Sequence, residues 1–418
     1  MRALVSTRID RIDAPGGLVR LRLLLLALGT FAVGTDGMVT AGILPLVARD
    51  LNVSISVAGQ MVTVFALAYG ILAPVLATAT SHWPRRHALL TALAVFTAAN
   101  ALTALAPSYG ALLGTRVLAA VGAALYTPTA SAVATSLVPP ERRGRAIAVV
   151  MGGLTVATAL GVPLGTWIGR TDWRLTMWLV TGLGAAAFAG LAGLLRELPQ
   201  PPAALTLRER LAPLADRRVV GAAATTFLIF VAFQTTYIYY TVATHPATGG
   251  SQDKLTLLLL VSGIAAVAGS QLGGRLVDAW GPRVVVLSAL TAYAAVAATA
   301  PWTLRTMPTA LAASAVTPVI GWALAVAQVT RITAIAPADA PVLVSLSSSA
   351  TYLGMAAAGG TGSLALSLFG DRWFLLAGAG IAVLALGVAA VTTAPGAPLD
   401  GRRQGRLPVR EDSSQPLG

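Results

Sequence analysis

Residues 23–46 read LLLLALGTFAVGTDGMVTAGILPL, and Asp36 is the one charged side chain in this run. About 20 apolar residues in a helix cross the roughly 30 Å of hydrocarbon in a bilayer, because each residue rises about 1.5 Å. The run is therefore long and apolar enough to be a transmembrane helix, and the same pattern recurs along the chain.

The composition places the whole chain in a membrane. Of its 418 residues, 56% are hydrophobic and 11% are charged, and the mean hydropathy is +0.76, values outside the range of soluble domains. Apolar runs alternate with short polar breaks, which predicts an all-α integral membrane protein. We predict twelve spans, at residues 23–46, 57–79, 88–106, 109–133, 146–168, 175–195, 219–242, 255–274, 284–300, 310–330, 342–366 and 373–390.

The spans fall into two groups of six, which predicts two pseudo-symmetric bundles. We assign residues 1–22 to a cytoplasmic N-terminal segment, 23–195 to the first bundle, 196–218 to a cytoplasmic linker, 219–390 to the second bundle and 391–418 to a disordered cytoplasmic tail. The linker holds the segment LTLRERLAPL, which predicts a short amphipathic helix on the inner membrane surface. The tail is rich in Arg, Pro, Gly and Ser and lacks apolar periodicity.

The basic residues predict the orientation, because cytoplasmic loops carry an excess of Lys and Arg. With both termini in the cytoplasm, most of the 29 Lys and Arg residues fall on that side. The outer loops then hold Arg49, Arg170, Arg174, Lys254, Arg305 and Arg372. The net charge of +13 is therefore mainly a sign of topology, and we expect no nucleic-acid partner.

Two full charges fall inside the predicted spans, Asp36 in the first and Arg116 in the fourth. A charge at the bilayer centre costs about 2.5–3.5 kcal/mol on insertion scales, so it is usually retained to handle protons, ions or substrate. The depths of the two residues differ by about 4–5 Å, which permits contact. Burial favours the neutral form of a carboxylate, so Asp36 is the candidate proton-binding group. A permanent structural ion pair is the alternative.

Two loops repeat one another. The segment ATATSHWPRR at residues 77–86 aligns without gaps with GRLVDAWGPR at residues 274–283. Matching loops in the two halves predict two similar bundles with a binding site between them near the midplane.

Four segments together resemble the major facilitator superfamily, and within it the bacterial twelve-helix drug:proton antiporters. They are GTDGMVTAGILPLVARDLNVS from residue 34, RVLAAVGAA from residue 116, GLTVATALGVPLGTWIG from residue 153 and the GRLVDAWGPR loop. Among these antiporters, the chain resembles sugar, nucleoside and chloramphenicol exporters of high-GC bacteria. The resemblance implies the major facilitator fold and a place in the bacterial inner membrane.

The resemblance assigns roles to the charged pair and to the fifth span. In the family, the fourth-span arginine, here Arg116, takes part in proton transfer with the acid. Relatives often carry Glu one residue later, where this chain has Gly37, so the acid is turned by about 100°. The fifth span matches an exporter motif, although small residues at this spacing also pack helices in any membrane protein. The motif residues are Gly161, Pro163, Gly165 and Gly169.

The repeated loops resemble the cytoplasmic gate of the family. In the second half, Asp278 and Arg283 match the gate pattern. In the first half Ser81 replaces the acid, and Arg85 and Arg86 remain. Anchoring on the positive inner side is the alternative for such arginines.

Polar and aromatic residues of three spans are candidates for the substrate cavity. Those in the seventh span share one helical face by their spacing of three and four, although aromatic faces also pack helices or form interfacial belts. The family lines its cavity with helices one, four, seven and ten, which adds candidates from the fourth and tenth spans. The candidates are Tyr126, Phe230, Phe233, Gln234, Tyr237, Trp322 and Gln328. Tyr240 belongs to the same aromatic set of the seventh span, and the belt is the alternative that suits Tyr239 and Tyr240.

These observations predict a proton-coupled antiporter that exports a small amphiphilic molecule, such as a drug, nucleoside or sugar-like compound. A proton symporter for uptake and a non-transporting sensor of the same fold are the alternatives. We expect no enzyme, because the chain holds no HExxH or GxSxG motif and no Cys, and its three His fall outside the predicted spans. We expect no metal and no cofactor beyond the proton as coupling ion, and a monomer whose partners are its substrate and the lipid bilayer.

Overall fold

The computed structural model describes residues 16–195 and 206–392, and all regular elements within them are helices. The first bundle comprises α2 (Gly17–Asp50), α3 (Ile55–Ala79), α4 (Arg85–Ala104), α5 (Tyr109–Ser136), α6 (Arg143–Val156), η2 (Ala157–Gly161), α7 (Val162–Ile168) and α8 (Trp173–Leu194). The second comprises α10 (Arg217–Ile238), α11 (Tyr240–Thr248), α12 (Gln252–Thr303), α13 (Met307–Thr333), α14 (Ala340–Trp373) and α15 (Leu375–Thr392). The short elements are η1 (Pro140–Arg142), α9 (Leu207–Leu211), η3 (Ala212–Ala215) and η4 (Pro337–Asp339).

The helices confirm the predicted fold class. Within the described residues, eleven helical segments are long and apolar enough to cross a membrane. One of them, α12, holds both the eighth and the ninth predicted span, and Gly281 with φ 78° and ψ 156° breaks it between them. Glycine adopts this backbone conformation without a steric penalty, so the GRLVDAWGPR loop turns the chain here. The eleven segments thus carry twelve spans.

Residues in the polar breaks between the spans cap the helices that follow them. Ser54 accepts a hydrogen bond from the backbone N–H of Val57, and Ser108 accepts one from Ala111. These caps satisfy backbone donors that have no partner in the first turn of a helix. The loops therefore fix where α3 and α5 begin.

Some helix ends differ from the predicted spans. The first helix begins at Gly17, inside the segment assigned to the N-terminus, and α15 continues to Thr392. The seventh span, predicted to end at residue 242, breaks at Tyr239 and continues as α11 to Thr248. Gly249 then ends it with φ 61°, a left-handed conformation that glycine adopts readily. Residues 1–15 and 393–418 of the predicted terminal segments lie outside the described part of the chain.

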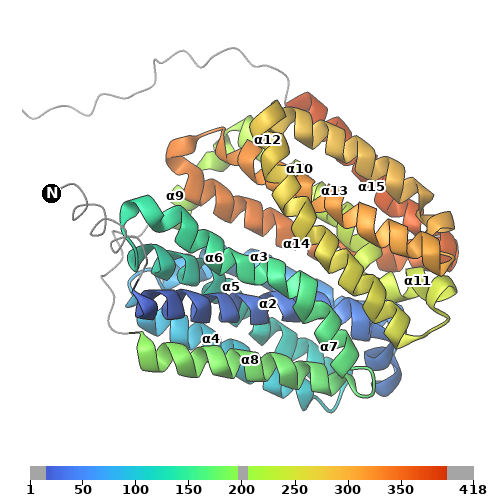
Figure 1. Cartoon of the computed structure of the whole chain (residues 1–418), viewed down its shortest axis with the longest axis horizontal. Coiled ribbons are helices and arrows are strands. Elements are labelled where there is room, and N and C mark those ends of the chain that lie inside the picture. Colours follow the sequence, from blue (N-terminus) through green and yellow to red (C-terminus); the bar gives the residue numbers. More distant parts are fainter. Residues whose placement is uncertain (1–15, 196–205, 393–418) are drawn as a thin grey trace, which may run out of the picture.

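Helices α2 to α8 form one bundle and α10 to α15 the other, as the change from blue and green to yellow and red shows in Figure 1. The bundles meet where α3 packs against α14, and where η2 and α7 pack against α12. We call the ends of the helices near Asp50, Arg170 and Asp253 the predicted outer end, because the basic-residue pattern assigns them to that side. The orientation itself stays a prediction.

Four polar contacts join the bundles at the predicted outer end. The Thr241 hydroxyl donates to the Ala41 carbonyl at 2.6 Å, and the Gln252 amide donates to the Gly42 carbonyl at 3.4 Å. An ion pair joins Arg170 to Asp253 across 3.4 Å, and the hydroxyls of Ser56 and Ser363 are in contact. The structure is therefore closed between the bundles at this end.

The described part of the linker contains the short helix α9. Thr206 and Glu209 form a capping box at its start, in the segment predicted to be amphipathic. Leu207, Leu211 and Leu214 are exposed, and their spacing places them on one side. Contact of this side with the membrane surface stays a prediction.

Candidate functional site

The two charges of the predicted spans meet inside the first bundle. Nη1 of Arg116 on α5 lies 2.6 Å from Oδ1 of Asp36 on α2. The side chain of Asp36 is fully buried and that of Arg116 is 1% exposed, so neither faces the lipid. A charge pair in a medium of low polarity interacts strongly, but it also loses its hydration.

One oxygen of the acid remains without a partner. Asp36 Oδ2 and Arg116 Nε make no hydrogen bond within the described residues. Carbon Cζ of Arg116 lies 4.5 Å from the centre of the Phe65 ring on α3, a distance at which the ring face attracts a cation. Oδ2 thus has no partner within the described residues while Arg116 binds Oδ1.

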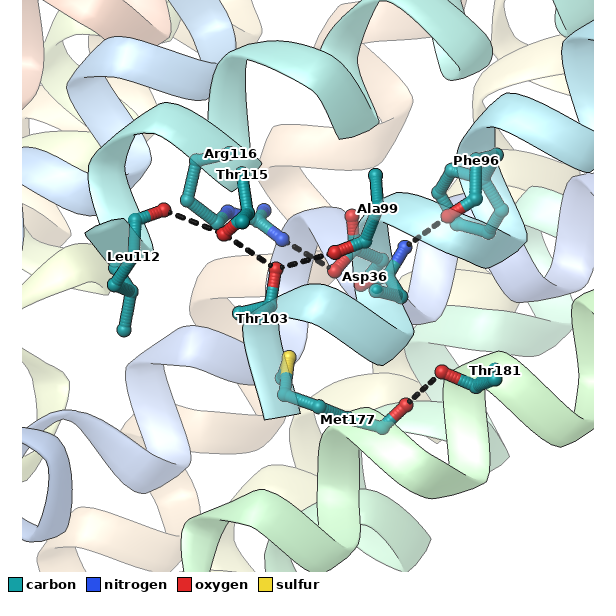
Figure 2. A network of polar contacts seen from close by, with 10 residues as sticks. Asp36, Phe96, Ala99, Thr103, Leu112, Thr115, Arg116, Met177 and Thr181 are labelled. Carbon is teal, nitrogen blue, oxygen red and sulfur yellow. Dashed lines mark hydrogen bonds and ion pairs between the residues drawn. The ribbon is translucent and has the colours of Figure 1, made fainter. Parts of the chain in front are cut away.

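A polar cluster on α4 and α5 borders the pair (Figure 2). The Thr103 hydroxyl lies 2.9 Å from the Thr115 hydroxyl and 2.8 Å from the Ala99 carbonyl oxygen. The amide nitrogen of Asn100 donates to the Phe96 carbonyl at 3.0 Å, while its Oδ1 makes no hydrogen bond within the described residues. The surroundings of the pair therefore contain polar groups that are themselves buried.

The glycines of the fifth span pack against the helix that carries the acid. A Cβ atom at Gly161 would collide with Thr35, the residue before Asp36. At Gly165 it would lie 2.6 Å from Val39, and at Gly169 it would lie 3.1 Å from Ile43. Glycines four residues apart in the fifth span thus pack against residues four apart on α2.

The opposite side of the fifth span reaches the second bundle. Residues Ala157–Gly161 form a π-helical turn before Pro163, and such turns are frequent at functional sites. A Cβ atom at Gly263 of α12 would lie 2.5 Å from Ala159, so the backbones approach closely. The Thr158 hydroxyl lies 3.5 Å from Sδ of Met38, two residues beyond the acid. The π-helical turn therefore connects α2 with α12.

A cavity of about 1180 Å³, counting its part open to solvent, lies mainly within the second bundle. Its walls come from α10, α11, α12 and α13, and Met38 and Thr158 complete them from the first bundle. Asp36 and Arg116 are not among the lining residues, so the acid and the cavity are neighbouring but separate.

Most of the predicted cavity residues line this cavity. They are Phe230, Phe233, Gln234, Tyr237 and Trp322. Tyr126 does not, because its ring lies in the first bundle beside Gly29 and its hydroxyl donates to the Leu26 carbonyl at 2.9 Å. Gln328 does not either, because its amide donates to the Ala222 carbonyl at 2.7 Å.

Some lining residues had no assignment from the sequence, and the belt suggested for Tyr239 and Tyr240 is wrong because both side chains are buried. Tyr293 on α12 stacks on Phe233 with ring centres 4.9 Å apart, and its position as a lone aromatic in an alanine-rich span is a usable signal. Tyr240 lines the cavity and contacts the Ser314 hydroxyl at 2.5 Å, whereas Tyr239 donates to the Gly359 carbonyl at 3.0 Å. Small hydroxyl residues such as Ser262 carry no comparable signal.

The predicted gate residues divide between the two halves. Arg85 donates to the Ala132 carbonyl at 3.0 Å, and Arg86 donates to the Leu195 carbonyl at 2.7 Å, so both bind backbone carbonyls at or beside the ends of α5 and α8. The contact of Arg86 satisfies a carbonyl at the end of α8, whereas the Ala132 carbonyl also accepts from the Thr135 hydroxyl at 2.8 Å. The structure gives Asp278 and Arg283 no ion pair within the described residues. Their gate role stays a prediction.

Two membrane-spanning bundles and a cavity beside a buried charge pair define a class, the multi-pass membrane transporters. The sequence pattern of the Major Facilitator Superfamily matches residues 26–249, and the chain belongs to this family.

The chain is similar to curated transporters over part of their length. It is 31% identical over 259 residues to the inner membrane transport protein YdhP of Escherichia coli, and this alignment covers 61% of this chain and 66% of YdhP. It is 29% identical over 278 residues to a chloramphenicol efflux pump of Mycobacterium tuberculosis, which covers 65% of this chain and 67% of the pump. The chain thus matches about two thirds of the length of each of these relatives.

A solved structure supports the fold independently. The structure of a bacterial homologue of the human lysosomal transporter Spinster aligns with a TM-score of 0.71 at 18% identity, over 91% of this chain and 98% of that one. At this identity the likeness concerns the fold alone, and it agrees with the two-bundle arrangement.

Proposed function

We propose that this chain is a proton-coupled antiporter that exports a small amphiphilic molecule across the bacterial inner membrane by alternating access. The observation that carries the proposal is the buried Asp36, with one oxygen bound by Arg116 and the other without a partner in the described residues. A retained intramembrane acid of this kind is a candidate proton site. Two residues further along the same helix, Met38 lines the cavity.

The coupling follows from differential binding. Asp36 holds a proton when the cavity faces outward and releases it when the cavity faces the cytoplasm. Substrate needs only to favour the deprotonated, inward-facing form for the proton gradient to do work. One acid corresponds to one proton in each cycle.

Export is favoured over uptake by the fifth span. Its glycines resemble the exporter motif, and they pack the span tightly against α2 at Thr35 and Val39. A closely packed span can keep protons from leaking past the acid while the bundles move. The relative named as an efflux pump supports the same direction.

Inside-out membrane vesicles test the proposal. Their lumen corresponds to the outside of the cell, so an acidic lumen should drive accumulation of an exported probe from a panel of antibiotics, nucleosides and sugars. A symporter would not accumulate its substrate in this arrangement. Accumulation under an alkaline lumen would reverse the assignment.

The variant Asp36→Asn should abolish gradient-driven accumulation. Because this change leaves Arg116 without its carboxylate, the double variant with Arg116→Gln is measured beside it to separate coupling from folding. The matched control is Asp50→Asn on the same helix, whose carboxylate is bound by Arg174 and Trp173 at the predicted outer end. Wild-type accumulation by folded Asp36→Asn protein would contradict the proposal.

A further inference from the structure

We infer that the cavity selects an uncharged aromatic molecule with hydroxyl, carbonyl or amide groups, so that export moves one net charge inward in each cycle. The inference rests on the proposed function and deepens it by naming the substrate class. None of the described residues that line the cavity has a charged side chain. An ionised group that enters such a space loses hydration without gaining a counter-charge.

The polar groups of the cavity suit neutral partners. Gln234 is 4% exposed, lines the cavity, and its side-chain amide makes no hydrogen bond to any described residue. Thr317 and the indole of Trp322 also line the cavity. An amide and a hydroxyl both donate and accept, and an indole N–H donates. Together they match hydroxyl, carbonyl and amide groups and offer no fixed charge.

Four of the six described aromatic side chains that line the cavity are paired with one another and do not surround an open space as in a cage for a cation. Such cages surround a positive charge with open ring faces. Here Phe233 and Tyr293 stack on one another, with ring planes 13° apart. Tyr237 and Tyr240 stack at 6.3 Å with planes 28° apart. The rings of each pair cover one another's faces, and their remaining faces and edges form apolar walls against which a flat ring of the substrate packs.

The charge pair does not supply the missing counter-charge. Asp36 and Arg116 neutralise one another at 2.6 Å, and neither lines the cavity. Protonation of Asp36 leaves Arg116 as a net positive charge, which repels a cation further. Substrate and proton therefore occupy separate sites, and a cationic substrate is disfavoured in both protonation states.

The separation fixes the electrical balance of transport. One proton enters for each neutral molecule that leaves, so one positive charge moves inward. A membrane potential of about 60 mV and a pH difference of one unit then drive accumulation equally. Either one alone can raise the ratio of outside to inside substrate to about tenfold. Exchange of a proton for a monovalent cation would move no net charge and would ignore the potential.

Inside-out vesicles that contain the full chain test this equivalence. The uncharged probes are chloramphenicol and uridine, and the cationic probes are ethidium and tetraphenylphosphonium. In one experiment the lumen is one pH unit more acidic without a potential. In the other, valinomycin and a potassium gradient make the lumen about 60 mV positive at equal pH. We expect an uncharged probe to accumulate to a similar ratio in both.

The outcomes separate the inference from the proposed function. Accumulation of an uncharged probe driven by pH but not by the potential overturns the inference and leaves proton coupling standing. Potential-independent accumulation of a cationic probe also overturns it. If the pH gradient drives no probe, the proposed function fails and the inference fails with it.

A charge placed in the cavity gives a second test. The variant Thr317→Asp adds a carboxylate to the lining, and Thr317→Val is the uncharged control of similar shape. We expect the first to lower accumulation of the uncharged probe at least fivefold and to admit a cationic probe, while the second continues to exclude cations. Equal selectivity of the two folded variants would contradict an uncharged site.

Discussion

Tyr69 of α3 and Tyr352 of α14 stack across the boundary between the two bundles, with ring centres 3.5 Å apart. Tyr69 also lies 6.4 Å from Phe65, whose ring faces Arg116 at 4.5 Å. Three aromatic side chains thus connect the guanidinium that binds Asp36 with a helix of the other bundle. A movement between α3 and α14 must separate or rearrange this stack, which adjoins the ring that contacts Arg116.

Loss of the Tyr352 ring should loosen this boundary. Tyr352→Ala removes a ring contact worth about 0.5–1.5 kcal/mol beyond its buried area, which corresponds to roughly 2- to 10-fold. The chain has no Cys, so a cysteine introduced at buried Ala66 beside Met355 reports opening of the boundary. We expect maleimide to label it at least 2- to 10-fold faster in the alanine variant, because the lost buried area of the ring adds to the lost ring contact.

Tyr352→Phe is the matched control, because it keeps the ring and removes only the hydroxyl. Its labelling rate should equal that of the parent protein. Equal rates in the alanine variant and the parent would show that the stack does not hold the bundles together.

A side chain at Gly165 should disturb the helix that carries the acid. The Cβ atom of Gly165→Ala would lie 2.6 Å from Val39 and 3.2 Å from Thr176. Overpacking of this kind costs about 1–3 kcal/mol, and it moves α2 near Asp36. We expect a lower thermal stability in detergent and a faster proton leak through vesicles without substrate.

Gly152 provides a control of opposite sign in the same span. A Cβ atom there meets nothing within 4 Å, and alanine is favoured over glycine in a helix by about 0.5–1 kcal/mol. Gly152→Ala should therefore retain transport and raise the stability slightly. A stable, tightly coupled Gly165→Ala variant would remove the argument for close packing.

The spans could be predicted from the sequence because insertion into a membrane depends on the summed hydropathy of about 20 residues. The contact of Asp36 with Arg116 was also within reach, since both depths follow from the helix rise. The rotation of each helix about its own axis could not be predicted. Apolar residues face lipid, a neighbouring helix or a cavity with little difference in composition.

Gln234 and Gln328 illustrate this limit. Both are buried amides in apolar spans, yet Gln234 lines the cavity while Gln328 donates hydrogen bonds to Ala222 and Thr226 inside the bundle. The difference depends on which carbonyls a neighbouring helix presents, and no pattern within one span contains that information. The match of each glycine in the fifth span to one residue of α2 was hidden for the same reason.

Acid should weaken the start of α9. The backbone N–H and the hydroxyl of Thr206 both donate to Glu209, at 2.7 and 2.8 Å, and they hold the pKa of this carboxyl below its ordinary value of 4.5. A lowered pKa means that the capping interaction is fully present above pH 4.5 and is lost as the pH falls below it.

Amide hydrogen exchange measures this loss as the protection of residues in α9 above and below pH 4.5. Glu209→Gln keeps an acceptor oxygen without the charge, so its protection should not change across that range. A parent protein with equal protection at both pH values would contradict a role for the ionised cap.

The ion pair between Arg170 and Asp253 should help to hold the predicted outer end closed. Its side chains are 45% and 76% exposed, and pairs of this kind contribute about 0.2–1 kcal/mol. Asp253→Arg replaces attraction by repulsion, and cysteines at Ser56 and Ser363, which are in contact across the same boundary, report closure through their rate of disulfide formation. We expect the rate to fall roughly 1.5- to 5-fold at low salt and to recover in the double swap with Arg170→Asp.

About 1 M salt shortens the screening length to roughly 3 Å, so the effect of Asp253→Arg should disappear there. A decrease that persists in high salt, or that the swap does not reverse, would assign the closure to the neutral contacts of Thr241 and Gln252.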